Sequence, residues 1–384
     1  MNSSLKYEMG PIRPPNEATS LLLRFTRNCP WNGCLFCHIY KGKRFEKRSL
    51  EELKRDIDTV KEIHDSIIEL SWRRGFAGKV TADLVAEIFS NPSSNECTRQ
   101  VAIWMFYGKR HVFIQDANSL AGEKGVIIEA LRYLKEKFPE IDRITSYARS
   151  KTVAKRYSVE DLASLREAGL TRLHIGLETG YDFLLKYMNK GVTKAEHVEA
   201  GQKVRASGIE LSEYVMPGLG GQRWWREHAE ETADALNHIN PHFIRLRTLK
   251  VLPSMPLYRK VEEGDFVLAS EEEIVVEERL MIERLEGIES YIKSDHALNL
   301  LEEIDGKLPE TKAEILSVID RFLSLPEEER LIFRFGRRAG IYRTLDDLKD
   351  DLTYFRIKKT IREMEAKEAG SVERTISVLL ENYI

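Results

Sequence analysis

The feature that most constrains the fold is an alternation of short apolar runs with longer amphipathic stretches. Six of these runs are rich in β-branched and aromatic residues, which is typical of strands. They lie at residues 20–26, 111–115, 143–148, 172–177, 209–216 and 242–249. Parallel strands that alternate with helices are joined by right-handed crossovers, so the pattern predicts an α/β fold. Six such units favour a partial or full α/β barrel, with an open doubly wound sheet as the alternative.

Two segments depart from this alternation. Residues 70–108 contain the loop Asn91-Pro-Ser-Ser-Asn95, and we interpret them as a helical insertion between the first and second strands. After Pro253-Ser-Met-Pro256 the chain continues with helical patterns only. The sequence therefore predicts three parts. They are an N-terminal segment (1–19), a barrel core (20–255) and an all-α C-terminal region (256–384).

Composition excludes several classes of protein. Of the 384 residues, 42% are hydrophobic and 32% are charged, which is typical of a globular chain. Lys and Arg number 59 against 62 for Asp and Glu, so the net charge of −3 gives no electrostatic reason to expect nucleic-acid binding. No apolar run approaches the length that spans a bilayer, and no signal peptide is recognisable at the start. We therefore expect a cytoplasmic protein without a membrane partner.

The four cysteines are the strongest chemical signal. Cys29, Cys34 and Cys37 lie together just after the first predicted strand, whereas Cys97 stands apart. Three thiolates from one short loop can hold an iron–sulfur cluster and leave one iron open to another ligand. The alternative is a structural zinc site, with His38 or Cys97 as the fourth ligand.

The cysteine loop resembles that of the radical S-adenosylmethionine (SAM) superfamily. The spacing is Cys29-x4-Cys34-x2-Cys37, where the family usually has three and then two intervening residues, and the aromatic Phe36 precedes the last cysteine as in the family. The resemblance covers about residues 20–253. It implies a partial (β/α)6 barrel of radical SAM type. It also implies a [4Fe–4S] cluster on Cys29, Cys34 and Cys37, and SAM as the second cofactor.

Two further segments of the first half fit this resemblance. Gln115-Asp-Ala-Asn118 follows the second strand, where the family contacts the methionine amino group, and Asp116 would pair with that group. A plain strand-end turn is the alternative. Arg149 ends the third strand and would meet the SAM carboxylate, unless it is a solvent-exposed side chain. The resemblance thus places Phe36, Gln115, Asp116, Asn118 and Arg149 among the cofactor-binding residues.

The fourth and fifth strands end in segments that also resemble the family. In Leu173-His-Ile-Gly-Leu-Glu-Thr-Gly180, Glu178 would accept hydrogen bonds from the SAM ribose; a helix cap is the alternative. In Met216-Pro-Gly-Leu-Gly-Gly221, Met216 and Gly218 would approach the adenine, and a flexible turn is the alternative. All these segments follow the carboxyl ends of strands, where barrel enzymes carry their active sites.

Other residues give weaker indications about the substrate. Arg245 and Arg247 alternate along the sixth strand and share one face, from which they could bind an anionic group, and Glu213 lies on the fifth strand. His174, in the middle of a strand, is interpreted as a packing residue. Two further groups of residues could form a lid over the substrate or a surface for an acidic partner. The alternative is an exposed basic helix face. The groups are Trp224-Trp225, and Arg334, Arg337, Arg338 and Arg343.

The resemblance implies a radical SAM enzyme. An electron from reduced ferredoxin or flavodoxin would cleave SAM, and the resulting 5′-deoxyadenosyl radical would abstract hydrogen from an unidentified small-molecule substrate. No catalytic side chain beyond the cofactor contacts is assigned. One alternative is a zinc-stabilised α/β binding protein without redox chemistry. Another is a radical SAM enzyme that modifies tRNA, although the charge balance counts against a nucleic-acid partner.

Overall fold

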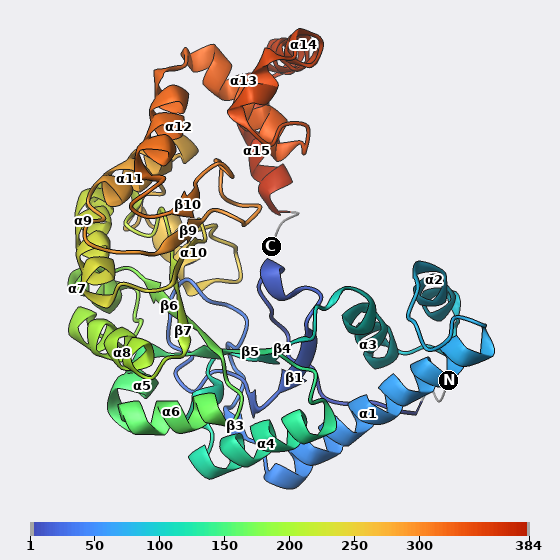
Figure 1. The fold of residues 1–384 in the computed structure, drawn as a ribbon. Coiled ribbons are helices and arrows are strands. Elements are labelled where there is room, and N and C mark those ends of the chain that lie inside the picture. The colour runs from blue at the N-terminus through green and yellow to red at the C-terminus, as the bar shows by residue number, and fades with distance from the viewer. Residues whose placement is uncertain (1–3, 382–384) are drawn as a thin grey trace. The chain divides into compact units, whose positions relative to one another are not determined.

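The computed structural model describes residues 4–381, shown as a ribbon in Figure 1. Its strands are β1 (Leu21–Arg24), β2 (Thr26–Arg27), β3 (Glu46–Lys47), β4 (His111–Gln115), β5 (Arg143–Ala148), β6 (Arg172–Glu178), β7 (Glu210–Val215), β8 (Phe243–Leu246), β9 (Tyr291–Lys293) and β10 (Asp305–Lys307). Its helices are α1 (Leu50–Arg73), α2 (Ala82–Ser90), α3 (Glu96–Tyr107), α4 (Lys124–Lys137), α5 (Ser150–Arg156), α6 (Val159–Glu167), α7 (Asp182–Tyr187), α8 (Lys194–Ala206), α9 (Gly221–Ile239), α10 (Pro256–Glu262), α11 (Glu271–Glu283), α12 (Lys312–Ser324), α13 (Glu327–Arg338), α14 (Asp351–Lys367) and α15 (Ser371–Glu381). Short 3-10 helices are η1 (Pro15–Glu17), η2 (Ser119–Ala121) and η3 (Leu345–Lys349).

The strands form a mostly parallel sheet in the order β1-β4-β5-β6-β7-β8-β9-β10. The pairs β1–β4, β4–β5, β5–β6 and β8–β9 are parallel, and β9–β10 is antiparallel. Consecutive parallel strands are joined by helices, as the sequence alternation requires. The predicted α/β fold is therefore confirmed. Strands β2 and β3 form a separate antiparallel pair with Arg27 opposite Glu46.

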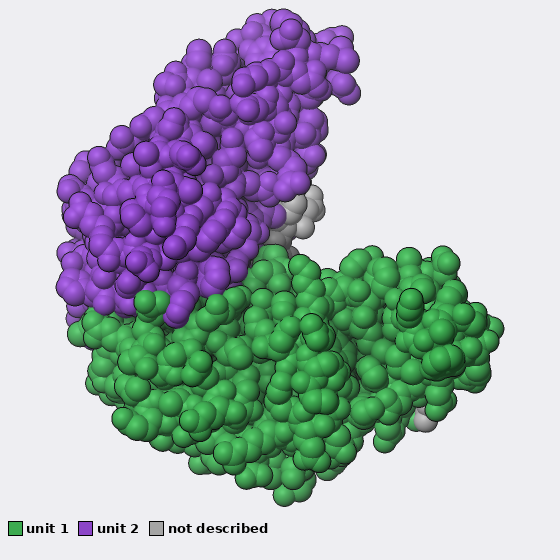
Figure 2. Space-filling model, in the orientation of Figure 1, with its two compact units in different colours: residues 1–176, 195–212 green, residues 177–194, 213–384 purple. Residues whose placement is uncertain are grey.

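The chain divides into two compact units, coloured separately in Figure 2. Unit 1 comprises residues 1–176 and 195–212, and unit 2 comprises residues 177–194 and 213–384. Strands β6 and β7 contribute residues to both units. Each unit is described separately below.

In unit 1 the chain forms α1 because apolar residues recur at helical spacing behind a capping box. Ser49 accepts a hydrogen bond from the Glu52 amide, and the Glu52 side chain bonds back to the Ser49 amide. Ile57, Val60 and Ile67 are buried where α1 packs on α3 and α4. The expected helical insertion over residues 70–108 is confirmed, since α2 and α3 lie there.

In unit 2 the same kind of capping box, Ser270 with Glu273, begins α11, which packs on α9 and α12. The prediction of an all-α C-terminal region needs correction, because β9 and β10 lie within it. These strands have three residues each and are defined by pairing with β8 and with each other, not by an apolar run of their own. No helix within residues 4–381 has the length and apolar character needed to cross a membrane.

The interpretation of the α13 arginines as an exposed basic face is also wrong. Arg334 and Arg338 are 8% and 2% exposed. Both donate to Glu271 of α11, and Arg334 also pairs with Glu373 of α15. Because a buried arginine needs anionic or carbonyl partners, these ion pairs hold α11, α13 and α15 together. Arg343 is the exposed member of the group.

Candidate functional site

The three clustered cysteines lie on the loop between β2 and β3, in unit 1. None of the three forms a disulfide, and all are half-exposed. Cys29 Sγ accepts a hydrogen bond from the Asn32 amide at 3.4 Å, and Asn32 has a left-handed backbone with φ 51°. Asparagine tolerates that conformation better than most residues, so the sequence suits this tight turn. Phe36 is buried beside Cys37 in the chain.

Cys97 does not belong to this loop. It is buried in α3, where its thiol donates to the Tyr7 carbonyl at 3.4 Å. Between residues 4 and 381, no three His, Cys, Asp or Glu side chains converge at the distances of a single metal ion. A zinc ion requires such a convergence, whereas the cysteines of a [4Fe–4S] cluster bind different irons.

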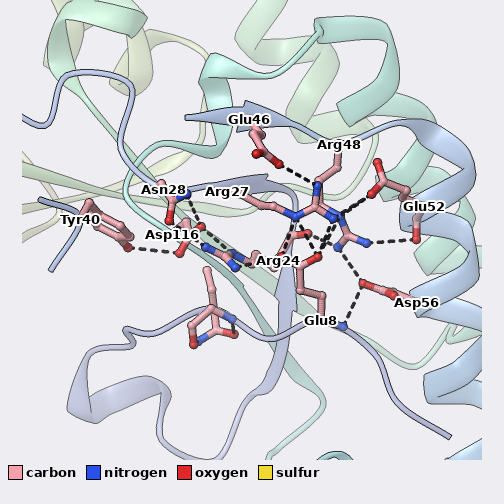
Figure 3. A network of polar contacts seen from close by, with 12 residues as sticks. Glu8, Arg24, Arg27, Asn28, Tyr40, Glu46, Arg48, Glu52, Asp56 and Asp116 are labelled. Carbon is pink, nitrogen blue, oxygen red and sulfur yellow. Dashed lines mark hydrogen bonds and ion pairs between the residues drawn. The ribbon is translucent and has the colours of Figure 1, made fainter. Parts of the chain in front are cut away.

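A buried carboxylate holds both ends of the cysteine loop (Figure 3). Asp116, at the end of β4, is 0% exposed. Its Oδ2 accepts hydrogen bonds from the Asn28 amide at 2.8 Å and from Arg24 Nε at 2.6 Å. Its Oδ1 accepts from the Tyr40 hydroxyl at 3.2 Å. Burial raises the pKa of Tyr40 and the Asp116 charge adds to this, so the hydroxyl stays protonated and can donate.

A network of paired charges continues outward from Asp116, as Figure 3 shows. Arg24 also donates to Glu8 at 2.9 Å, and Glu8 accepts from Arg27 at 2.6 Å. Burial raises the pKa of Glu8, but the hydrogen bonds and charges of the arginines outweigh this and lower it overall. Arg48 pairs with Asp56 of α1 at 2.7 Å. The base of the cysteine loop is therefore fixed by ionised side chains.

Gln115 and Asn118, both predicted cofactor contacts, have partners within unit 1. Gln115 accepts from the Gly10 amide at 2.8 Å and donates to the Gly10 and Ile12 carbonyls at 2.9 and 3.0 Å. Asn118 accepts from the Arg149 amide at 3.2 Å and donates to Thr152 at 2.7 Å. Gln115 therefore fastens the N-terminal segment, and Asn118 fixes the start of α5.

Arg149 lies beside the cysteine loop. Its guanidinium is 5.3 Å from the centre of the Trp31 ring. Burial lowers the pKa of Arg149, and the negative charges of Cys29 and Cys34 oppose that effect. Within unit 1, Arg149 therefore lies near the cysteine loop, and its predicted contact with the SAM carboxylate stays a prediction.

In unit 2, Glu178 occupies the end of β6 with a left-handed backbone, φ 64°. It accepts a hydrogen bond from Lys190 at 2.9 Å. Beside it, Glu213 of β7 is 0% exposed, and neither of its carboxyl oxygens has a hydrogen-bond partner among the residues described. Burial raises the pKa of Glu213 well above its usual range; Glu178 adds to this, and Lys190 opposes it. Burial and the neighbouring Glu178 carboxyl thus both favour the protonated form of Glu213.

The turn of Met216 and Gly218 is held by two residues that sequence reasoning missed. His228 of α9 is hydrogen-bonded to the Thr179 hydroxyl at 2.8 Å and to the Met216 carbonyl at 3.2 Å. Glu277 of α11 accepts from the Gly218 amide at 2.8 Å. Nothing in the sequence singles them out, because His228 follows a Trp-rich turn and Glu277 lies in a Glu-rich helix.

Burial shifts the pKa values of His228 and Glu277. Burial lowers the pKa of His228 to about 4, so its ring is neutral near pH 7. Burial raises the pKa of Glu277, while the Gly218 amide opposes this. Gly218 itself has φ 84°, a left-handed backbone conformation that favours glycine, and a β-carbon there would lie 2.9 Å from the end of the Ile274 side chain.

The residues considered for substrate binding have internal partners. Arg245 and Arg247 both pair with Asp295, Arg247 at 2.9 Å. Trp224 packs against the rings of Phe183 and Tyr187. The packing interpretation of His174 is confirmed, since it is 0% exposed and lies near the rings of Phe113 and Tyr147.

Residues 89–236 match the sequence model of the Radical SAM superfamily. This segment of the chain is therefore similar to the radical SAM superfamily. The match covers the segments of Asp116, Arg149, Glu178 and Met216 but begins after the cysteine loop.

Curated relatives match only part of this chain. It is 23% identical over 122 residues to the tRNA uridine(34) acetyltransferase of Methanocaldococcus jannaschii. The aligned residues make up 30% of this chain and 22% of the relative. It is 26% identical over 130 residues to the uncharacterized protein YtqA of Bacillus subtilis, covering 34% of this chain and 39% of that one. The chain thus spans about a fifth of the acetyltransferase.

Solved structures give distant similarities. Elp3 of Methanocaldococcus infernus aligns over 55% of this chain and 54% of its own, with 18% identity and a TM-score of 0.40. The cobalamin-dependent radical enzyme OxsB aligns over 94% of this chain and 58% of its own, with 14% identity and a TM-score of 0.45. At these scores and identities, neither neighbour assigns a reaction or substrate to this chain.

The residues of the cysteine loop fit a cluster. Three half-exposed cysteines that form no disulfide lie on one loop whose two ends are fixed, and an arginine lies beside them. Amide donors to sulfur, such as that of Asn32, are among the interactions that tune iron–sulfur centres.

Proposed function

We propose that this chain is a radical SAM enzyme in which Cys29, Cys34 and Cys37 bind three irons of the [4Fe–4S] cluster. The observation that carries the proposal is the fixed loop of three half-exposed thiols in a chain whose residues 89–236 match the radical SAM sequence model. Bound together and reduced, the two cofactors supply a one-electron cleavage of SAM that generates a radical able to abstract hydrogen. We propose an unidentified small molecule as the substrate.

The roles of the chain's own residues follow from their chemistry. Arg149 would donate to the SAM carboxylate, because its planar guanidinium suits that group. Glu178 would accept from the ribose hydroxyls, and the hydrogen bond from Lys190 holds its carboxyl in place. Met216 and Gly218 would allow close approach of the adenine, and Phe36 would exclude water around the loop.

We do not include Gln115, Asp116 or Asn118 among the residues that touch SAM. The Asp116 carboxylate has no exposed surface and three hydrogen-bond donors. Both amide side chains are hydrogen-bonded within unit 1 and buried. A side chain with no exposed surface and a full set of partners cannot reach a ligand without giving up those bonds.

The electron would come from a reduced carrier, for which we propose ferredoxin or flavodoxin. We also propose a cytoplasmic location, because a reducing compartment keeps three neighbouring thiols from forming disulfides. An electron carrier is needed only if the cluster is redox-active. Redox activity of the cluster is therefore the first property to test.

The test is an anaerobic reaction of the iron- and sulfide-reconstituted chain with SAM and dithionite. We expect 5′-deoxyadenosine and methionine to form in equal amounts, detected by mass spectrometry. Cys34→Ala should form neither. SAM that stays intact in the wild-type reaction, in a sample that carries a full iron content, would overturn the proposal.

A second candidate is radical chemistry on tRNA, which the partial similarity to tRNA uridine(34) acetyltransferases favours. Electrostatic RNA binding weakens steeply as salt rises. Filter binding of bulk tRNA at low and high salt therefore tests it. Tight, salt-dependent binding would replace the small-molecule substrate by tRNA, and its absence would leave the first proposal standing.

A further inference from the structure

We infer that Asp116 is a positioning residue that fixes the cysteine loop before any iron binds, and that the N-terminal segment of residues 8–12 seals it in place. We call this segment the strap. The inference rests on the proposed role of Cys29, Cys34 and Cys37 as ligands. It gives Asp116 a different task from the contact with SAM that the sequence predicts.

The first step is that one carboxylate holds both ends of the loop. The Asn28 amide, bonded to Oδ2, belongs to the residue directly before Cys29. The Tyr40 hydroxyl, bonded to Oδ1, belongs to a residue just after Cys37. Since all three thiols lie between these two anchors, the position of Asp116 limits how far the ends of the loop can separate. A loop whose ends are fixed has less conformational entropy to lose when it binds a ligand.

The second step is that the carboxyl group is paired with an arginine and held in place. Arg24 Nε lies 2.6 Å from Asp116 Oδ2, and Arg24 is held in turn by Glu8 of the strap. A buried carboxylate needs such a partner, because an unpaired charge without water is strongly unfavourable. Asp116 itself has φ 73°, a left-handed backbone that aspartate tolerates better than most side chains.

The third step is that the strap covers the carboxylate and shields it from water. Gln115, the neighbour of Asp116, bonds both backbone groups of Gly10. A β-carbon on Gly10 would lie 2.8 Å from Asp116 Oδ1 and 2.9 Å from Gln115 Cβ. Only glycine lets the strap approach this closely, and the approach accounts for the complete burial of Asp116.

Gly10→Ala therefore offers a test that changes no charge and removes no hydrogen-bonding group. The added methyl must displace either the strap or the Asp116 carboxylate. Gly125→Ala is the matched control, because a β-carbon on Gly125 in α4 meets no atom within 4 Å. Asp116→Asn replaces the carboxyl group by an amide. Tyr40→Phe removes the hydrogen bond from the Tyr40 hydroxyl to Asp116 Oδ1.

The measurement is hydrogen exchange of the full chain prepared without iron, followed peptide by peptide. In Gly10→Ala and Asp116→Asn we expect the Asn28 amide and the loop peptides to exchange at least about 10-fold faster, while α4 exchanges as in the wild type. Tyr40→Phe should loosen mainly the end of the loop after Cys37. Gly125→Ala should match the wild type in the loop.

Unchanged loop exchange in both Gly10→Ala and Asp116→Asn would overturn the inference. If Asp116→Asn does not fold, Gly10→Ala and Tyr40→Phe still decide it. After reconstitution, the same variants should show an altered electron paramagnetic resonance spectrum of the reduced cluster at a melting temperature close to that of the wild type. An unchanged spectrum would also count against positioning.

The proposed function fails separately from this inference. If Cys34→Ala keeps its iron, the ligand assignment is wrong, whereas the exchange experiment contains no iron and still reports on the loop. If the cysteine variants lose iron but Gly10→Ala leaves loop exchange unchanged, only the positioning role is wrong.

Discussion

In unit 1 the loop of Cys29, Cys34 and Cys37 is held by paired charges, whereas in unit 2 the turn of Met216 and Gly218 is held by hydrogen bonds from two buried side chains. Asp116 and Glu8 are each bonded to arginines. His228 and Glu277 instead bond to a hydroxyl, a carbonyl and an amide. The comparison shows two ways to fix a ligand-binding segment: by paired charges, or by hydrogen bonds to desolvated side chains.

Buried carboxyl groups of the two units respond to pH in opposite directions. Outside the cysteine loop, burial raises the pKa of Glu17 in unit 1, but His174, Arg143 and Ser20 outweigh this and lower it to about 2. Its contribution to stability is present above the ordinary value of 4.5 and is lost as the pH falls toward 2. A buried carboxyl with a raised pKa behaves in the reverse manner, because the folded state then holds the extra proton.

The largest effect that sharpens the comparison is expected from the cysteines. Cys34→Ala should lower the iron content from about four per chain to near zero, because the cluster loses one of three protein ligands. Cys97→Ala should retain iron, since Cys97 is buried in α3 with the Tyr7 carbonyl as its partner. Iron and sulfide analysis after anaerobic reconstitution checks both. Iron loss in Cys97→Ala would move the ligand set out of the loop.

The second largest effect is expected at Glu178, where SAM binding and iron content should respond differently. Glu178→Gln should weaken SAM binding by about 10- to 100-fold, the size expected when charge-assisted hydrogen bonds are lost. Its iron content should not change, because Glu178 lies in unit 2 and the cysteines in unit 1. Equilibrium dialysis with labelled SAM measures the affinity, and the exposed Glu262→Gln is the control. Equal affinity in the two variants would remove Glu178 from the SAM site.

A third prediction uses pH. Burial raises the pKa of Glu278 in α11 to about 8, with the Arg338 charge opposing it. Between the ordinary value of 4.5 and about 8, the folded state binds more protons than the unfolded chain, so stability falls as pH rises. Glu278→Gln should flatten this decline in a series of thermal melts from pH 5 to 8. The same slope in the variant and the wild type would mean that the neutral form is not what unit 2 requires.

The smallest effect is expected at His228. His228→Gln should weaken SAM binding by only about 3-fold, because it disturbs the positions of Thr179 and Met216 without removing a group that touches SAM. The same dialysis checks this, with iron content as the internal control. A loss as large as that of Glu178→Gln would place His228 in contact with the ligand.

Local patterns predicted much of the scaffold. Residues 111–115 and 143–148 form β4 and β5 with the predicted bounds, because short runs of β-branched and aromatic residues between turn signals favour strands. β10 could not be predicted, since Asp305-Gly-Lys307 has no apolar character and becomes a strand by pairing with β9. The burial of Arg334 and Arg338 depends on Glu271, which is more than 60 residues away in the chain.

In the candidate site, too, contacts between residues far apart in the sequence could not be predicted. Cysteine spacing and strand-end motifs identify which residues are chemically notable, because those signals are contiguous in sequence. The partners of Asp116 are 76 and 88 residues away, at Tyr40 and Asn28. A turn-forming aspartate and a loop-fixing aspartate look alike in the sequence, so only the fold distinguishes them.

The most direct test of the central claim is the electron paramagnetic resonance spectrum of the anaerobically reconstituted, dithionite-reduced chain, recorded before and after SAM is added. We predict a [4Fe–4S] signal that shifts on SAM addition in the wild type, shifts less in Glu178→Gln at the same SAM concentration, and is absent in Cys34→Ala. A colourless protein that holds about one zinc per chain and gives no signal would contradict the account.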